Sequence, residues 1–254
     1  MTRSIFVTGA AAGIGRATAV LFARRGWLVG LYDVDEAGLA RVAAEIGESA
    51  TVRGRLDVAD PRAFEPAIAA FGDRTGGRMD VLFNCAGILR MGAFDAIPIA
   101  EYERQVAINV LGPIYGIRAA LPLLARGERP AIVTMSSASA QYGVPEMAVY
   151  SATKFFVRGL TEALELELSA RGVRVCDVAP GYVATDMVSS QKTPARSVGK
   201  LGVSLTAEDV AEVVWKAVHG RGVHHFVEAK VAALARVGGA IPSIARRVLA
   251  HYSR

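Results

Sequence analysis

Strand-like and helical segments alternate along almost the whole chain, with short links between them. Apolar runs typical of buried strands occur at residues 5–7, 27–32, 50–55, 81–83, 131–135, 173–178 and 223–227. Helical patterns separate them, at residues 17–26, 36–46, 61–71, 101–124, 150–170 and 207–219. Such an order is typical of a parallel sheet, because parallel strands need a crossover between them. We therefore predict an α/β fold with a doubly wound parallel sheet of about seven strands, helices on both faces, and a single domain over residues 1–254.

A glycine-rich turn lies between the first strand and the first helix. It reads Thr8-Gly9-Ala10-Ala11-Ala12-Gly13-Ile14-Gly15. Glycines let a backbone turn tightly and approach a pyrophosphate, and the free N–H groups of the following helix supply positive potential. Isolated glycines would indicate an ordinary turn, but the strand–glycine–helix context favours a dinucleotide site.

Asp33 ends the second strand, where a carboxylate can accept hydrogen bonds from the ribose diol of a bound adenosine. A carboxylate there repels a 2′-phosphate, and no basic residue between Gly9 and Gly13 reverses that preference. These residues favour NAD over NADP. A helix N-cap is the alternative role for Asp33, and the glycine turn favours the cofactor role. Asp57 and Asn84 follow the third and fourth strands, at the same predicted edge of the sheet.

Tyr150 and Lys154 are four residues apart in a helical pattern, and therefore lie on one face of that helix. A phenol keeps its proton up to a pKa of about 10. A lysine cation alongside favours the phenolate, which lowers that pKa and can produce an acid/base group near neutral pH. Taken alone, the pair is also typical of a solvated helix face.

Pro113 interrupts the long helical pattern that carries Asn109. Because proline has no N–H, the carbonyl of Asn109 loses its usual donor and could hold a water molecule instead. A plain helix kink is the alternative.

Composition excludes several classes of function. The chain is 52% hydrophobic and 21% charged, so it can bury a large core. Its net charge of +5 comes from scattered residues without a basic run, which argues against nucleic acid. Cys85 and Cys176 are far apart and form no ligand-spaced motif, so we expect no disulfide and no metal. With no visible signal peptide and no uninterrupted apolar stretch of about 18 residues, we expect a cytoplasmic protein.

Two late segments differ from the strand–helix alternation. Residues 189–203 are polar and without clear periodicity, which predicts a substrate lid. Residues 229–254 continue into two helical patterns, at 229–237 and 242–252, and form a helical extension. The second pattern is basic and amphipathic, and such a helix can contact a membrane surface. Packing over the substrate site or against a subunit interface is the favoured alternative.

Taken together, the motifs resemble the classical-type branch of the short-chain dehydrogenase/reductase family. The resemblance covers about residues 3–227, in order and at the family's spacings. It is carried by Thr8-Gly9-(x)3-Gly13-Ile14-Gly15, Asn84-(x)-Ala86-Gly87, Asn109, Ser137, Tyr150-(x)3-Lys154 and Pro180-Gly181-(x)3-Thr185. It implies a Rossmann-like fold and an NAD(P)-dependent oxidoreductase acting on CH–OH groups.

The resemblance also implies a role for each motif residue. Tyr150 would be the general acid/base, and Lys154 would lower its pKa and bind the nicotinamide ribose. Ser137 would hold the substrate oxygen, and Asn109 would hold a water on a proton path from Lys154. Thr185 and the backbone near Val183 would position the carboxamide. The full set of expected cofactor contacts is Gly9, Ala12, Gly13, Ile14, Gly15, Asp33, Asp57, Val58, Asn84, Ala86, Gly87, Tyr150, Lys154, Pro180, Gly181, Val183 and Thr185.

The residues expected around the substrate and the segment after the last strand predict the substrate class and the oligomeric state. The expected substrate wall is mostly apolar and consists of Leu89, Met91, Tyr142, Val144, Met147, Tyr182 and Met187. It predicts a hydrophobic secondary alcohol or ketone as the small-molecule substrate. Many family members end in a Val-Asp-Gly-Gly-type segment that packs on a neighbouring subunit, whereas this chain continues through Glu228 into helices. That departure favours a homodimer, through the Asn109 and Tyr150 helices, over a tetramer.

Two alternative functions remain open at this point. One is an NADPH-dependent ketoacyl reductase acting on carrier-bound chains, against which Asp33 argues. The other is a catalytically silent dinucleotide sensor, against which the presence of Ser137, Tyr150 and Lys154 argues.

Overall fold

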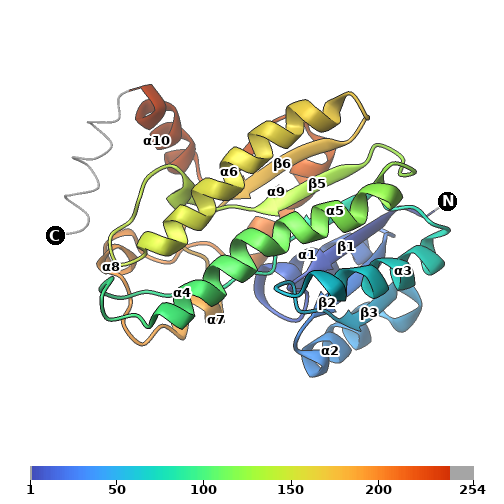
Figure 1. The fold of residues 1–254 in the computed structure, drawn as a ribbon, viewed down its shortest axis with the longest axis horizontal. Coiled ribbons are helices and arrows are strands. Elements are labelled where there is room, and N and C mark those ends of the chain that lie inside the picture. The colour runs from blue at the N-terminus through green and yellow to red at the C-terminus, as the bar shows by residue number, and fades with distance from the viewer. Residues whose placement is uncertain (1, 241–254) are drawn as a thin grey trace.

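A computed structural model describes residues 2–240. Seven parallel strands form one sheet in the order β3-β2-β1-β4-β5-β6-β7 (Figure 1). The strands are β1 (Ser4–Thr8), β2 (Leu28–Asp33), β3 (Thr51–Arg55), β4 (Val81–Asn84), β5 (Ala131–Met135), β6 (Arg174–Ala179) and β7 (His224–Phe226). The order reverses direction between β1 and β4, and ligands of open parallel sheets bind at such a point. The predicted fold class is confirmed.

Helices cover both faces of this sheet. They are α1 (Gly13–Arg24), α2 (Glu36–Ile46), α3 (Phe64–Thr75), α4 (Ile99–Val106), α5 (Gly112–Leu124), α6 (Ala148–Ser169), α7 (Asp186–Ser189), α8 (Arg196–Leu201), α9 (Ala207–His219) and α10 (Ala229–Ala240). Short 3₁₀ turns occupy η1 (Glu48–Ala50), η2 (Pro61–Ala63) and η4 (Ala138–Ala140).

The alternation of side chains along each strand builds two separate cores. Val7, Val29 and Val133 point to one face, where they pack against α1, α2 and α9. Phe6 and Ile132 point to the other face, where they pack against α3 and α5. Strands buried on both faces read as continuous apolar runs, which is why they were recognisable in the sequence.

The helix that carries Asn109 is distorted at the expected place. A π-helical segment, η3 (Ala107–Leu111), joins α4 to α5 just before Pro113. The missing N–H of proline accounts for this widened turn, because the regular hydrogen-bond ladder cannot continue through it. Residues 99–124 therefore form one long helix. Within residues 2–240, this helix alone is long and apolar enough to cross a membrane by length and composition, a test that core helices of soluble proteins also pass.

The segment 189–203 has more order than the sequence predicted. It contains α8 and the end of α7, and Gln191 ties it to the segment after β4. The Gln191 Nε2 donates to the carbonyl of Leu89 at 3.1 Å, and its Oε1 accepts from the N–H of Met91 at 3.2 Å. Helices this short lack a full amphipathic period, so periodicity could not reveal them. The second predicted C-terminal helix lies outside the described residues.

Candidate active site

A cavity of about 530 Å³ opens at the carboxyl ends of the strands. The glycine turn forms its floor, and the ends of β2, β4, β5 and β6 form its sides. Residues of α6, α8 and the start of α10 complete its walls. The Tyr150 and Lys154 side chains line the same cavity as the glycine turn.

The glycine turn leaves no room for side chains. Gly9 and Gly13 have φ values of +71° and +51°, which L-residues rarely adopt. A Cβ on Gly9 would approach the Cα of Ala86 to 2.8 Å, and a Cβ on Gly15 would collide with the carbonyl oxygen of Gly9. No side chain caps the start of α1, and its first turn carries no acidic residue. The turn is therefore an open, positively polarised cradle that fits a pyrophosphate.

Asp33 is held in place by the glycine turn. Its Oδ2 accepts a hydrogen bond from the N–H of Ala11 at 3.1 Å, and its Oδ1 accepts from the N–H of Asp35 at 3.1 Å. The N-cap of α2 is Asp35, whose Oδ1 accepts from Gly38 at 2.9 Å. The alternative role of Asp33 as that cap is therefore wrong, and its carboxylate lines the cavity.

Lys154 is buried beneath the cavity. Its side-chain nitrogen donates to the carbonyl of Met135, the last residue of β5, at 2.8 Å. The residue is only 5% exposed, and burial lowers the pKa of Lys154 to about 8, with the charges of Cys85 and Asp177 opposing this effect. With its pKa lowered to about 8, the Lys154 ammonium can release its proton at a pH only slightly above neutral.

The pKa of Tyr150 differs from the predicted direction. Withdrawal from water raises it to about 12, while a hydrogen bond with Ser137 acts to lower it. The Lys154 Nζ lies 5.5 Å from the centre of the Tyr150 ring, over its face. Desolvation is the largest effect on the pKa of Tyr150, and the net lowering expected from Lys154 is not seen.

The Asn109 side chain holds the backbone after β4 and does not line the cavity. Its Oδ1 accepts from the N–H of Ile88 at 2.9 Å, and its Nδ2 donates to the Ile88 carbonyl at 2.9 Å. The Nδ2 also donates to the Oγ1 of Thr153, the neighbour of Lys154, at 3.2 Å. Asn109 thereby joins the long helix, helix α6 and the segment that follows β4.

Most predicted site residues line this one cavity. Those that do are Gly9, Ala12, Gly13, Ile14, Gly15, Asp33, Ala86, Gly87, Leu89, Ser137, Tyr142, Val144, Met147, Tyr150, Lys154, Pro180, Gly181, Tyr182, Val183, Thr185 and Met187.

Four other predicted contacts lie behind the cavity wall. The carboxylate of Asp57 accepts from the N–H of Ala59, and Val58 is buried. Asn84 is 4% exposed, and Met91 is buried with its sulfur against the N–H of Ala195. Their positions in the sequence place them near the right edge of the sheet, but they are not among the residues that line the cavity.

The start of α10 contributes wall residues that we did not predict. Glu228, Lys230 and Val231 line the cavity. The Glu228 carboxylate accepts from the N–H of Gly181 at 3.1 Å and pairs with Lys230 at 2.8 Å. A signal was available, because a helical pattern directly after the last strand must begin at the edge of the sheet where ligands bind.

Comparisons with known proteins agree with this geometry. Residues 3–196 match the family model described as short chain dehydrogenase. The chain is 37% identical to a 2-keto-3-deoxy-L-fuconate dehydrogenase from Xanthomonas campestris pv. campestris, over 85% of this chain and 66% of that protein. It is 35% identical to a 2,5-dichloro-2,5-cyclohexadiene-1,4-diol dehydrogenase from Sphingobium indicum, over 77% of this chain and 82% of that protein.

Among solved structures, a short chain dehydrogenase/reductase from Burkholderia phymatum in complex with NAD has the same fold. The TM-score is 0.86 at 24% identity, and the match covers 96% of this chain and 95% of that chain. The resemblance drawn from the sequence motifs is therefore confirmed. The chain belongs to the short chain dehydrogenase family and is an oxidoreductase acting on CH–OH groups.

Proposed function

We propose that this protein transfers a hydride between NAD and a hydrophobic secondary alcohol or ketone, with Tyr150 as acid/base. The observation that carries the proposal is that Ser137, Tyr150 and Lys154 line the same cavity as an unobstructed glycine cradle. A protein that only senses dinucleotides would need the cradle but not these three side chains.

Residues of the cradle would hold the cofactor. The first turn of α1 would face the pyrophosphate, and the Asp33 carboxylate would bind the adenosine ribose. Two backbone N–H groups already orient that carboxylate, so a 2′-phosphate would meet a fixed negative charge. This arrangement supports NAD over NADP. When bound, the nicotinamide supplies the hydride chemistry that no protein side chain can provide.

The side chains divide the proton chemistry among themselves. In the oxidation direction, the Tyr150 phenolate accepts the proton of the substrate hydroxyl, and in reduction the phenol returns it to the carbonyl oxygen. Ser137 donates a hydrogen bond to that same oxygen and stabilises the charge that develops on it. The Lys154 ammonium would act against the desolvation that raises the pKa of Tyr150, and its buried anchor on Met135 keeps it close to the Tyr150 ring. Asn109 would hold the water that passes protons to solvent.

The substrate end of the cavity is apolar. Leu89, Val144 and Met147 are buried there, and Tyr142 and Tyr182 pack against them. Such a wall favours substrates with hydrocarbon surface, because polar groups would lose hydration without finding partners. The name of the Sphingobium relative, which specifies a chlorinated cyclohexadiene diol, supports a substrate of this kind.

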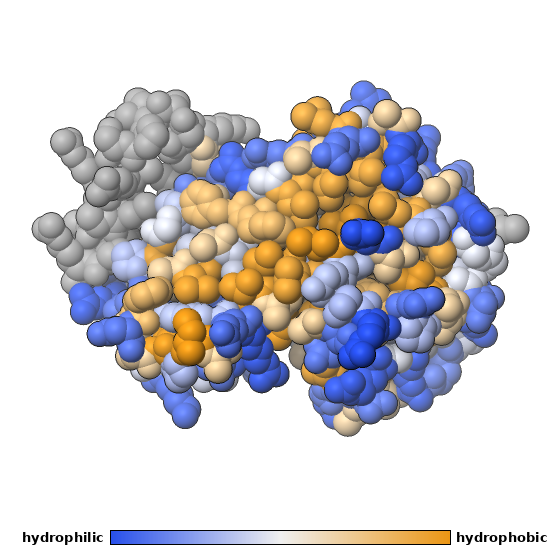
Figure 2. Space-filling view, in the orientation of Figure 1, coloured by the Kyte–Doolittle hydropathy of each residue, from blue (hydrophilic) through white to orange (hydrophobic). Residues whose placement is uncertain are grey.

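We also infer one catalytic domain, with residues 189–203 as its substrate lid, and a homodimer. Apolar side chains are exposed along the helices that carry Asn109 and Tyr150. Val106 is 39% exposed, Leu111 37%, Phe155 44% and Leu166 75%. Figure 2 shows apolar surface extending over α5 and α6, and a second copy of the chain would cover it.

The test combines a substrate screen with one substitution. The purified protein is assayed with NAD(H) against a panel of secondary alcohols and ketones, from small hydroxy acids to cyclic and long-chain compounds. Turnover is expected only with the hydrophobic members. The Tyr150→Phe variant should bind NADH as the wild type does, by fluorescence, and lose about 10²- to 10⁴-fold in kcat. Unchanged turnover in that variant would refute the role of Tyr150, and turnover of only the charged hydroxy acids would refute the substrate class.

A further inference from the structure

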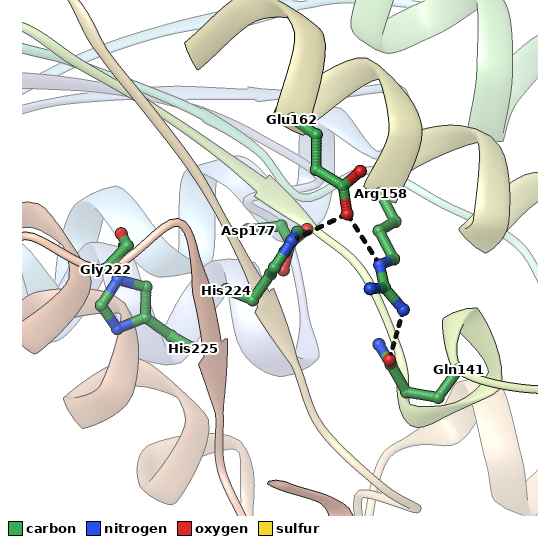
Figure 3. A network of polar contacts seen from close by, with 7 residues as sticks. All are labelled: Gln141, Arg158, Glu162, Asp177, Gly222, His224 and His225. Atoms are coloured by element: carbon green, nitrogen blue, oxygen red, sulfur yellow. Dashed lines mark hydrogen bonds and ion pairs between the residues drawn. The ribbon is translucent and has the colours of Figure 1, made fainter. Parts of the chain in front are cut away.

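Five polar side chains form a continuous chain of contacts beside the catalytic helix, and we call them the polar strap (Figure 3). They are Gln141, Arg158, Glu162, His224 and Asp177. Arg158 Nη1 donates to Gln141 Oε1 at 2.6 Å, and Arg158 Nε donates to Glu162 Oε1 at 2.9 Å. The two ring nitrogens of His224 then contact Glu162 Oε1 at 3.1 Å and Asp177 Oδ2 at 2.8 Å.

The polar strap joins the elements that carry the proposed catalytic groups. Arg158 follows Lys154 by one helical turn, as Lys154 follows Tyr150, so all three lie along one side of α6. Gln141 directly follows η4, the turn that begins after Ser137. At the other end, Asp177 in β6 pairs in register with Thr134, the neighbour of the Met135 carbonyl that holds Lys154. The strap therefore connects the Ser137 turn, the catalytic helix and the edge of the sheet.

The polar strap needs a positive charge on His224. A neutral imidazole has one N–H, whereas both ring nitrogens of His224 face carboxyl oxygens. Burial raises the pKa of Asp177, and when both carboxyl groups are ionised the two contacts are hydrogen bonds only in the imidazolium form. The hydrogen bond with Asp177 raises the pKa of His224 above its ordinary value. The other charged groups facing it are Glu162 and Arg158 on α6. Its neighbour His225 contacts the Gly222 carbonyl at 2.9 Å, and burial lowers the pKa of His225.

The buried Asp177 end of the polar strap fixes the position of its exposed Arg158–Glu162 end. Arg158 and Glu162 are 35% and 50% exposed, and an isolated ion pair this exposed contributes little to stability because solvent screens it. Such a pair would not hold the Arg158 guanidinium against Gln141. Asp177, whose side chain is 2% exposed, fixes His224, and the charged His224 in turn fixes Glu162. The orientation of Arg158 is thus determined from the interior of the protein.

We infer that Arg158, Glu162, His224 and Asp177 are positioning residues, which hold the Ser137 turn against the catalytic helix while His224 is charged. None of the four lines the cavity, so they act on Ser137 and Tyr150 only through Gln141 and the path of α6. This inference rests on the proposed function, because it concerns how the proposed catalytic groups are held. Loss of the charge on His224 would loosen the turn and slow the chemical step.

Two variants test the polar strap. Arg158→Lys keeps the charge but loses the fork that reaches both Gln141 and Glu162. We expect kcat to fall roughly five- to tenfold, since a shift well below 1 Å should cost less than the roughly hundredfold loss that follows a 1 Å misplacement. The KM for NAD should not change. The matched control is Arg53→Lys. Arg53 lies on β3 and forms an exposed ion pair with Glu48 of η1 at 3.0 Å, and its replacement should leave kcat unchanged.

His224→Gln supplies the pH signature. Because the folded pKa of His224 is raised, its charge is complete below about 6.5 and is lost as pH rises through the raised value. The ratio of wild-type kcat to His224→Gln kcat should therefore be largest at low pH and approach one at high pH. Taking this ratio cancels the titration of Tyr150 itself. A ratio that stays constant across the pH range would overturn the proposal.

A third measurement does not depend on the variants folding. The imidazole signals of the wild-type protein, followed by NMR against pH, should give His224 a pKa above 6.5, and a pKa at or below that value would overturn the proposal. Wild-type kcat in the Arg158→Lys variant would also overturn it. Failure of the proposed function has a different signature, namely full turnover in the Tyr150→Phe variant.

Discussion

Replacing Lys154 with methionine should make the folded protein more stable, although it removes a group that the proposed mechanism uses. Burial lowers the pKa of Lys154 from 10.5 to about 8. Since a difference of one in pKa corresponds to about 1.4 kcal/mol, keeping the buried ammonium charged costs about 3 kcal/mol of folding free energy. Methionine removes that cost and fills a similar volume. It also removes the hydrogen bond to the Met135 carbonyl, worth about 1 kcal/mol, so the expected net gain at neutral pH is about 2 kcal/mol.

The sign of the pH dependence follows from the two states. Below pH 8, Lys154 is protonated in both the folded and the unfolded chain, and the full cost is present. Between about 8 and 10.5, the unfolded chain holds the proton that the folded protein has released, so wild-type stability recovers as pH rises. The advantage of Lys154→Met should therefore be greatest at pH 6–8 and should shrink towards pH 10.

Urea unfolding at several pH values measures this difference. A gain of about 2 kcal/mol corresponds to a rise of roughly 4–8 °C in Tm for a chain of this size. Lys216→Met, at an exposed position on α9, is the matched control and should change stability little at any pH. If Lys154→Met instead lowers the free energy of unfolding, and by the same amount at pH 6.5 and pH 10, the buried ammonium carries no cost and the reasoning is wrong.

Three further substitutions test other parts of the site and the surface. Asp33→Asn should raise kcat/KM for NADP relative to NAD, because it removes the fixed negative charge at the ribose; an unaltered ratio in steady-state kinetics would contradict that role. Gly9→Ala should weaken NADH binding by at least about tenfold, since the new Cβ would reach the Ala86 backbone and φ is +71°; wild-type affinity by fluorescence titration would mean that the turn can relax. Phe155→Glu should shift the protein from dimer to monomer in analytical ultracentrifugation, and a dimer that persists would place the interface elsewhere.

The sequence by itself determined the fold class and most of the site. Strands buried on both faces appear as apolar runs, and short links between strands and helices allow few arrangements other than a parallel sheet. The carboxyl ends of such strands must meet at one edge, which is why the sequence predicts Gly9 and Asp33 in one cavity. Tyr150, on a helix, is placed there by the family resemblance.

Only the tertiary structure decided which side chains line the cavity and which groups far apart in the sequence come into contact. Asp57 and Met91 follow β3 and β4 in the sequence but do not line the cavity, and no pattern of residue types records which side chains the folded backbone presents to it. The raised pKa of Tyr150 results from burial by segments far apart in the sequence, and that burial outweighs the lysine one turn away. The polar strap links Gln141 to His224 through Arg158 and Glu162, and this link exists only because β6 pairs with β7 and α6 packs against β6. Local sequence can specify the elements, but charge–charge distances and desolvation are properties of the assembled fold.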